Sequence, residues 1–396
     1  MTQQIAKNEL EERRSKFYAA MTEAYPDWDT AMILSKVNQY YFTGTMQDGL
    51  LMIKKDRQVF YFVRRSFERA QDESPLSNIY TMESYRDAAI LAGPDCGYTF
   101  LETEIVTLGL IDRLQKHFNI EKIDSLDKII LSIRAVKSPY ELECLETSGK
   151  IHDRILMETV PKLLKEGISE ADFTAELFGE MVKQGHQGLS RFAMFQSEIV
   201  VGQIGFGENS LYPTCFDGPG GARGLYPAVP LLGSRDRKLK KGDLVFVDIA
   251  FGLNGYHSDK TQVYIFGGKP TSEMKKVHQG CIDVQNRTAE LLRPGAIPSE
   301  IYTLIMNRLD DQFKPNFMGF KDRQVKFLGH GVGLHVDEFP VIANGFRLPL
   351  VENMVISLEP KKGIENTGMV GVEDTYIVAP DGGKCITGGG RDILVV

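Results

Sequence analysis

The sequence of 396 residues lacks any Cys-x-x-Cys pair, and its cysteines are five in number and widely spaced. They are Cys96, Cys144, Cys215, Cys281 and Cys385. A disulfide framework is normally built from an even number of cysteines, and a structural zinc site from closely spaced ones. The sequence therefore indicates neither of these, and we expect a reducing compartment.

Long apolar runs are also missing, because no stretch of about 18 uncharged apolar residues occurs anywhere in the chain. The first ten residues are polar and contain no apolar core of the kind found in a secretory signal peptide. We therefore expect a cytoplasmic protein that does not act in a membrane.

An excess of positive charge is absent as well. Lysine and arginine number 46 against 53 aspartates and glutamates, which gives a formal net charge of −7. Binding to nucleic acid or to an anionic membrane leaves a basic patch that this balance does not indicate. Residues 188–241 are rich in glycine and proline but contain no G-x-x-x-x-G-K-[ST] pattern, so we interpret them as a long functional loop and reject nucleotide binding.

What is present divides into two parts. Residues 1–135 mix helical and strand-like patterns, which predicts a separate, smaller α/β domain. The spacing of apolar residues predicts helices over 1–22 and 104–117, and strands over 31–34, 49–53, 58–63 and 128–133.

The second domain, residues 136–396, begins with a helix start signal. Ser138 is a predicted N-cap, Pro139 occupies the first helical position, and Glu141 completes a capping box; Pro161 is expected to end this helix. Two similar helix-opening sequences, at 167–170 and 295–300, suggest two α-α-β units. Their helices would pack on the outer face of a curved antiparallel sheet. Chance similarity between capping sequences is the alternative.

The most informative stretch is Gly242–Tyr264, which is two apolar segments joined by Asn254-Gly255, the strongest short-range signal of a β-hairpin. With these two residues as the loop, Asp248 lies opposite Thr261, and Asp259 lies diagonally on the same face. Diagonal neighbours are about 7–8 Å apart at the backbone. Two metal ions separated by about 3.5–4 Å would fit between the two carboxylates.

Apolar residues on both faces of the first segment predict that this strand is buried on both sides. An unpaired buried carboxylate is strongly disfavoured, so Asp248 and Asp259 need a metal ion, a buried arginine or lysine, or raised pKa values. A structural ion pair, or an edge strand that faces water, remains the simpler alternative for the hairpin alone.

Further candidate ligands follow in the chain. His330 lies between two glycines in Leu328-Gly-His-Gly-Val-Gly-Leu334, and glycine lets the backbone approach a ligand closely. Glu359 and Glu373 each lie in a strand-like apolar segment, 354–360 and 369–378 respectively. Together with the two aspartates they form a carboxylate-rich set with one imidazole.

These motifs, in this order, resemble the pita-bread metallopeptidases, the family of Xaa-Pro aminopeptidase, prolidase, methionine aminopeptidase and the metal-free creatinase. The resemblance implies an α+β chain with a C-terminal pita-bread domain and a smaller N-terminal domain, and it implies a homodimer. It also implies two divalent ions (Mn, Co, Fe or Zn), with Asp248 holding one, Asp259 and Glu373 bridging both, and His330 and Glu359 holding the other.

The sequence departs from the pattern of the peptide-cleaving members at two places. They carry a Pro-His motif before the hairpin, which is absent here, and a second histidine where this chain has Asp337. His335 lies two residues earlier and, at strand spacing, on the same face. We therefore take Asp337 and His335 as candidate catalytic residues together with Glu359, which could shuttle protons. A carboxylate at 337 favours a cationic or donor-rich substrate group.

The leading hypothesis is a dinuclear-metal hydrolase that cleaves peptides next to proline, or related amides. A second is an enzyme of the same fold recruited to another small molecule, as a creatinase-like hydrolase or lyase. A third is a binding protein without catalysis, and the burial of four acids argues against it. His257, two residues before Asp259, is interpreted as a packing histidine in preference to a catalytic one.

Overall fold

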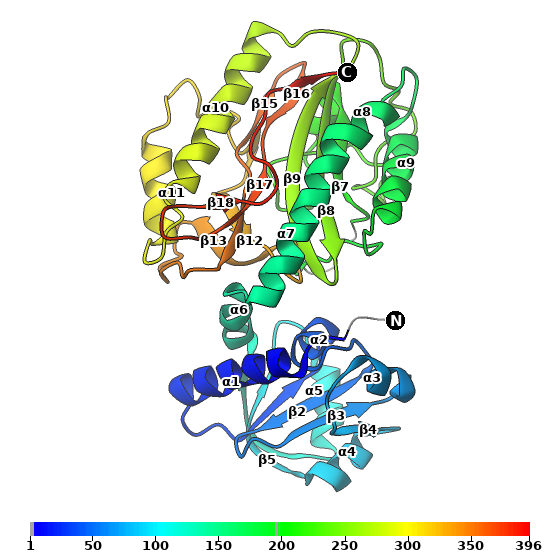
Figure 1. Ribbon diagram of the computed structural model, residues 1–396, viewed down its shortest axis with the longest axis vertical. Helices are drawn as coiled ribbons and strands as arrows, with labels where there is room; N and C mark the ends of the chain where they lie inside the picture. Colours follow the sequence, from blue (N-terminus) through cyan, green and yellow to red (C-terminus); the bar gives the residue numbers. More distant parts are fainter. Residues whose placement is uncertain (1–3, 195–196, 198) are drawn as a thin grey trace. The chain divides into compact units, whose positions relative to one another are not determined.

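The computed structural model describes residues 4–194, 197 and 199–396. By its internal contacts the chain divides into two compact units, residues 1–134 and 135–396 (Figure 1). Among the helices in the described part of the chain, none is long and apolar enough to cross a membrane.

The smaller unit is built on a six-stranded mixed sheet in the order β4-β3-β2-β1-β5-β6. Its strands are β1 (Thr30–Ile33), β2 (Gly49–Lys54), β3 (Val59–Val63), β4 (Ile79–Thr81), β5 (Asp95–Leu101) and β6 (Asn119–Ser125). Its helices are α1 (Lys7–Ala24), α2 (Lys36–Thr43), α3 (Phe67–Glu73), α4 (Tyr85–Ala92) and α5 (Leu108–Gln115). The strands predicted over 49–53 and 58–63 are confirmed as β2 and β3, which pair antiparallel as a hairpin.

The predicted strand at 128–133 is wrong, because these residues belong to helix α6 (Asp127–Ala135). Leu126, Ile130 and Ile133 are buried, and their spacing of four and three residues is that of one face of a helix. A short apolar run does not by itself distinguish a strand from a buried helix. The strand of this region is β6, which precedes it.

Helix α7 (Pro139–Arg154) opens the larger unit with the predicted capping box between Ser138 and Glu141. It continues through a π-helical turn, Ile155–Thr159, into the short helix α8 (Val160–Leu163), so it ends slightly beyond the predicted Pro161. Proline has no N–H to donate to the preceding turn, and a π-helical turn is one way to accommodate that loss.

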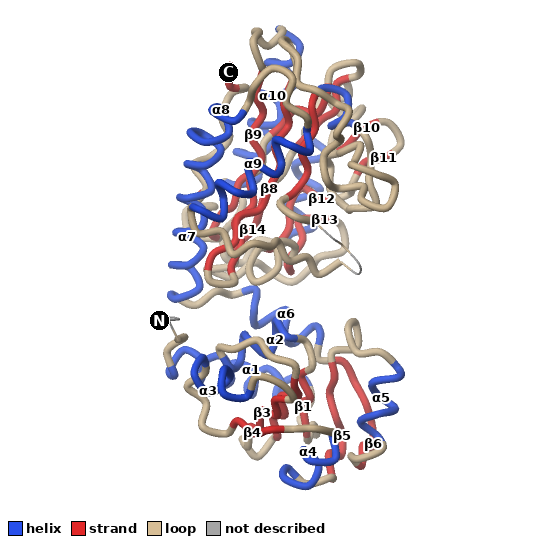
Figure 2. The backbone as a smooth tube through the Cα atoms, turned by 90° about the vertical axis from the view of Figure 1, so that its right-hand side faces the viewer, coloured by secondary structure: helices blue, strands red, loops and turns tan. Residues whose placement is uncertain are grey.

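The first half of the larger unit has a sheet in the order β19-β9-β8-β7. Its strands are β7 (Gly202–Phe206), β8 (Leu244–Leu253), β9 (Tyr256–Ile265) and β19 (Leu394–Val395). Helices α7, α8 and α9 (Glu170–Lys183) lie on one side of β8 and β9 (Figure 2). Val245, Val247, Ile249 and Phe251 of β8 are buried beneath them. Strand β7, followed by a 3-10 helix at Gly207–Leu211, lies within the stretch interpreted as a loop.

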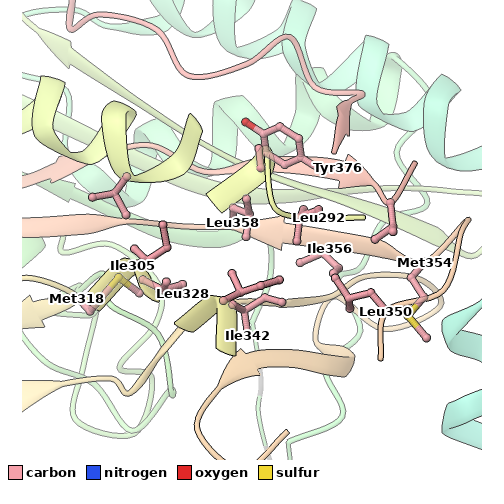
Figure 3. Packing of buried hydrophobic residues seen from close by; sticks show 14 of the residues in the cluster. Leu292, Ile305, Met318, Leu328, Ile342, Leu350, Met354, Ile356, Leu358 and Tyr376 are labelled. Carbon is pink, nitrogen blue, oxygen red and sulfur yellow. The ribbon is translucent and has the colours of Figure 1, made fainter. Parts of the chain in front are cut away.

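The second half has a sheet in the order β13-β12-β14-β17-β18. Its strands are β12 (Phe327–Gly331), β13 (Glu338–Ala343), β14 (Val355–Leu358), β17 (Asp374–Ile377) and β18 (Lys384–Cys385). Helices α10 (Ser272–Ala289) and α11 (Pro298–Asn307) cover it over a core that includes Ile356 and Leu358 (Figure 3). Ser357, between them, faces the opposite side, where its hydroxyl donates to Glu373.

The two sheets meet at a bridge between Thr261 of β9 and Glu373. The segment predicted as one strand over 369–378 is two strands, β16 (Gly368–Gly371) and β17, with Glu373 in the break between them. β16 forms a hairpin with β15 (Lys361–Ile364), and β10 (Gly319–Phe320) pairs with β11 (Arg323–Gln324). Each half has helices on one face, as the repeated helix-opening sequences predicted (Figure 1). The single antiparallel sheet that was predicted is divided into two, and β19 pairs with β9 in parallel.

Candidate metal centre

The β8–β9 hairpin has the predicted register. Asp248 lies opposite Thr261, and the turn residues Asn254 and Gly255 have φ values of 52° and 90°. Positive φ at both loop positions is the requirement of a type I′ turn, which Asn-Gly meets with little strain. The turn therefore fixes which residues of the hairpin face the seam between the sheets, and it places Asp248 and Asp259 on that face.

The remaining predicted ligands come from the second sheet. His330 lies opposite Ser357 in the β12–β14 pair, Glu359 follows the end of β14, and Glu373 precedes β17. Glycines on both sides of His330 are required by the packing, because a Cβ at Gly329 would lie 2.9 Å from Leu358 Cδ2 and one at Gly331 would lie 2.6 Å from the backbone of Phe339.

The structure brings all five predicted ligands together, and we call them the ligand cluster: Asp248, Asp259, His330, Glu359 and Glu373. His330 Nε2 lies 3.4 Å from Glu359 Oε1 and 3.9 Å from Glu373 Oε1. It lies 4.0 Å from Asp259 Oδ2. Thr261 Oγ1 is 2.9 Å from Asp248 Oδ1 on the neighbouring strand of the same sheet, and 3.1 Å from Glu373 Oε2 of the other sheet.

Part of this cluster fits a divalent ion directly. Ligand atoms of Asp259, His330 and Glu373 all lie within 4.8 Å of one another, and we call this group the histidine subsite. Carboxylate oxygens with one imidazole nitrogen suit Mn, Fe, Co or Zn. The residues present therefore fit one ion at this position.

Lys361 lies inside the same cluster, and the sequence interpretation did not include it. Its Nζ is 2.9 Å from Asp248 Oδ2, 2.8 Å from Glu359 Oε2 and 2.6 Å from Glu373 Oε2. The side chain has no solvent exposure. We call the position of this ammonium the lysine subsite. Its signal in the sequence was the spacing of two residues from Glu359, which on an extended chain directs both side chains to the same face.

The charges in the cluster shift one another strongly. Burial raises the pKa of Asp248 to about 7 although the ammonium of Lys361 opposes the rise. Burial, together with repulsion from Glu373 and Asp248, raises the pKa of Asp259 well above its ordinary value. Burial lowers the pKa of Lys361, but attraction by Asp248, Glu359 and Glu373 outweighs it, and the net pKa is well above the ordinary value.

His330 behaves in the same way as Lys361. Burial lowers its pKa, but the hydrogen bond and charge of Glu359 and the charges of Asp259 and Glu373 outweigh burial and raise the pKa to about 10. In the absence of an ion the imidazole is therefore a second cation among the acids. A metal ion at the histidine subsite would need the neutral form as its ligand.

The other two candidate catalytic residues lie in the segment after β12. Asp337 Oδ1 accepts a hydrogen bond of 2.8 Å from the backbone N–H of Ala193, and the neighbouring Val336 N–H donates to Arg191 O. Burial raises the pKa of Asp337. His335 donates its backbone N–H to Glu338 Oε1 at 2.8 Å. Asp337 therefore fastens the loop at 191–193, while roles of Asp337 and His335 in the reaction stay predictions.

His257 connects the hairpin to the same segment. Its backbone N–H donates to Gly333 O at 2.8 Å, and its Nδ1 is 3.2 Å from that oxygen. Its Nε2 lies 2.8 Å from Gln187 Nε2. Burial lowers its pKa to about 4, so the ring is neutral. These contacts are those of a packing histidine that holds the segment after β12 in place.

Comparison with known proteins identifies the class of this centre. Residues 143–380 match the family described as Metallopeptidase family M24, and residues 13–136 match the Creatinase/Prolidase N-terminal domain. The chain belongs to metallopeptidase family M24. The ligand cluster and Lys361 lie within the matched residues 143–380.

Similar proteins cover between about two thirds and nearly all of this M24 protein. It is 25% identical over 387 residues to the Xaa-Pro dipeptidase of Pyrococcus furiosus, covering 97% of this chain and 100% of the relative. It is 31% identical over 271 residues to the probable dipeptidase PepE of Mycobacterium bovis, covering 68% of this chain and 62% of the relative. The crystal structure of the prolidase from Pyrococcus horikoshii OT3 matches with a TM-score of 0.79 at 23% identity, covering 97% of this chain and 100% of that one.

These similarities confirm the predicted pita-bread fold with its N-terminal domain, and they confirm the prediction of a metal-dependent hydrolase of the peptidase class. They do not favour the alternatives of a creatinase-like enzyme or of a binding protein without catalysis.

Proposed function

We propose that this M24 protein is a dipeptidase that hydrolyses the bond before proline in short peptides. The observation that carries the proposal is the convergence of two aspartates, two glutamates and one histidine from both sheets on one buried point. The full-length similarity to an Xaa-Pro dipeptidase supports the substrate class.

In this proposal Asp259, His330 and Glu373 hold a divalent ion, and Glu359 completes its surroundings. Such an ion polarises a substrate carbonyl and lowers the pKa of a water molecule. Glu359 is the residue that moves the proton, because a carboxylate beside the reacting atoms can accept it and later release it to the leaving amine. Asp337 holds the loop at 191–193 through its bond to Ala193.

The family resemblance implies two further features. One is a second ion on Asp248, with Asp259 and Glu373 as shared ligands and Mn, Co, Fe or Zn as the metal. The other is a homodimer. The histidine subsite fits the first ion, whereas the position next to Asp248 is where the ammonium of Lys361 lies.

The test is hydrolysis of Xaa-Pro dipeptides against matched dipeptides without proline, with each of the four metals supplied to metal-free protein. We expect turnover that requires metal and prefers proline. Glu359→Gln should lower kcat far more than it changes KM, while Glu352→Gln, at an exposed position outside the cluster, should match the parent. Absence of metal-dependent turnover with all four metals would refute the proposal.

A further inference from the structure

We infer that Lys361 is a built-in cation that takes the place of one of two metal ions, so that the centre binds a single divalent ion, at the histidine subsite. This inference rests on the proposed function only in taking the ligand cluster as the metal centre. It concerns what fills that centre, and it does not depend on the substrate.

The backbone of Lys361 is fixed on both sides. Lys361 pairs with Gly371 in the β15–β16 hairpin, and its carbonyl accepts a hydrogen bond of 2.7 Å from Met318 N–H. A Cβ on Gly371 would lie 2.6 Å from Lys361 Cα and 3.1 Å from Lys361 Cγ, so the lysine stem occupies space that a glycine leaves open. The side chain of Lys361 has no exposed surface, so the carboxylates of the ligand cluster, and not water, surround its ammonium.

The carboxylates are oriented as they would be for two cations. Glu359 and Glu373 each direct Oε2 to Lys361 and Oε1 toward His330. Asp248 contacts the ammonium through Oδ2, while its Oδ1 lies at hydrogen-bond distance from Thr261. Each glutamate thus links the two subsites, with one oxygen at each. The ammonium lies where the Oε2 atoms of the two glutamates and Oδ2 of Asp248 converge.

A second ion and the ammonium cannot share this point. An ion held by the same three oxygens would lie about 2.0–2.2 Å from them, within the space that the ammonium fills. Two cations in contact in a buried site also repel each other strongly. The charges of Lys361 and one divalent ion together balance the four carboxylates more fully than the ion alone would. A second divalent ion would add repulsion among three cations.

The adjacent lysine shows that the arrangement is specific to position 361. Lys362 points to the other side of β15, where its Nζ donates to the backbone carbonyls of Phe313 and Pro315. It has the same side chain, the same strand and a buried position, but no contact with a carboxylate of the cluster is found for it in the described part of the chain. It is therefore a matched control.

The experiment measures bound Mn²⁺ per chain after saturation and gel filtration in the parent, Lys361→Ala and Lys362→Ala. We expect one ion per chain in the parent and in Lys362→Ala, and two in Lys361→Ala, because truncation opens the lysine subsite. Two ions in the parent, or the same number in the parent and in Lys361→Ala, would overturn the inference.

A second measurement needs no variant, in case Lys361→Ala does not fold. Two Mn²⁺ ions bridged by carboxylates couple magnetically, whereas a single ion gives an uncoupled electron paramagnetic resonance spectrum. We expect the uncoupled spectrum from the saturated parent, and a coupled spectrum would refute the inference. Failure of the proposed function would look different: the protein would hold one ion per chain and yet cleave no dipeptide.

Discussion

Glu359 and Glu373 each direct one carboxylate oxygen to Lys361 and the other toward His330. Each glutamate therefore interacts with the cation at the lysine subsite and with the group at the histidine subsite. Sequence reasoning required that the buried aspartates have a metal ion, a buried cation or raised pKa values. The structure provides two of these at once, because Lys361 contacts Asp248 and burial still raises the pKa of Asp248 to about 7.

Removing Asp259 tests the histidine subsite. Asp259→Ala leaves His330 and Glu373 as the two remaining members of the group of three, so we expect it to lose nearly all bound metal under a chelator that the parent withstands. Asp381→Ala, at an exposed position, should keep the metal content of the parent. Elemental analysis decides, and unchanged metal content in Asp259→Ala would show that this aspartate is not a ligand.

We predict that Asp337 gives the enzyme a preference for cationic substrates. A carboxylate cannot donate a hydrogen bond to an oxyanion as a histidine would, so we expect kcat/KM for uncharged Xaa-Pro dipeptides below about 10⁴ M⁻¹s⁻¹ and higher values for Lys-Pro or Arg-Pro. Asp337→Asn keeps an oxygen to accept from Ala193 N–H and removes the charge, so it should abolish the preference for cationic peptides. An unchanged preference in Asp337→Asn would contradict this role.

His186 supplies a prediction on pH. Its Nδ1 accepts a hydrogen bond from Gly252 N–H, and burial lowers its pKa from the ordinary value of 6.5 to about 4. The unfolded chain therefore binds a proton that the folded chain resists, and stability falls as pH drops from about 6.5 towards 4. Through this group alone the free energy of unfolding should be about 2 kcal/mol lower at pH 5 than at pH 7.

The control for this prediction is His186→Asn, which keeps an acceptor near Gly252 but does not titrate in this range. Its urea-unfolding midpoint should change less between pH 7 and pH 5 than that of the parent. Equal pH dependence in the two proteins would mean that His186 is not the group responsible.

At the scale of the elements, the hairpin was predictable because a two-residue Asn-Gly turn fixes the register of both strands. Strand β7 was not, because Gly202–Phe206 lies in a glycine-rich stretch without alternation, and its partner β8 determines that it is a strand. The place of Lys361 in the centre was not predicted from the sequence. It lies in β15, a four-residue strand that is buried because it pairs with β16, and the local pattern of apolar residues does not indicate that pairing.

Gly371→Ala tests the β15–β16 hairpin. Gly371 has a φ of 134°, and an added Cβ would meet Pro360 O and lie 2.6 Å from Lys361 Cα. We expect a loss of roughly 2–4 kcal/mol in the free energy of unfolding from backbone strain and overpacking together. Gly179→Ala in α9 meets nothing within 4 Å and should be neutral or stabilise by up to about 1 kcal/mol. Equal effects, measured by urea unfolding, would contradict this account.

At the scale of the whole molecule, the resemblance in four short motifs, which carry the five ligands, predicted the fold of both units. The ligands occur in a fixed order on strands of two similar halves. Details that depend on tertiary packing, such as the ammonium among the acids, could not follow from the order of motifs. The family match covers residues 143–380 and the N-terminal match 13–136, so the motifs were sufficient for architecture and class.

The oligomeric state is a prediction at this scale. We expect a homodimer, on the family resemblance, and light scattering at micromolar concentration measures it directly. A mass near the 44.4 kDa of one chain would contradict the prediction and would leave the metal centre unaffected, because all five ligands and Lys361 belong to one chain.

The enclosed ammonium of Lys361 also affects whether the chain folds before or after it binds metal. Four acids brought together without any counter-charge would resist closure of the two sheets until an ion arrived. A chain that carries Lys361 on its own strand, beside the protonated His330, has counter-charges of its own and can close before it acquires an ion. We therefore expect the metal-free chain to fold and to bind its ion afterwards, so that folding does not depend on the supply of metal.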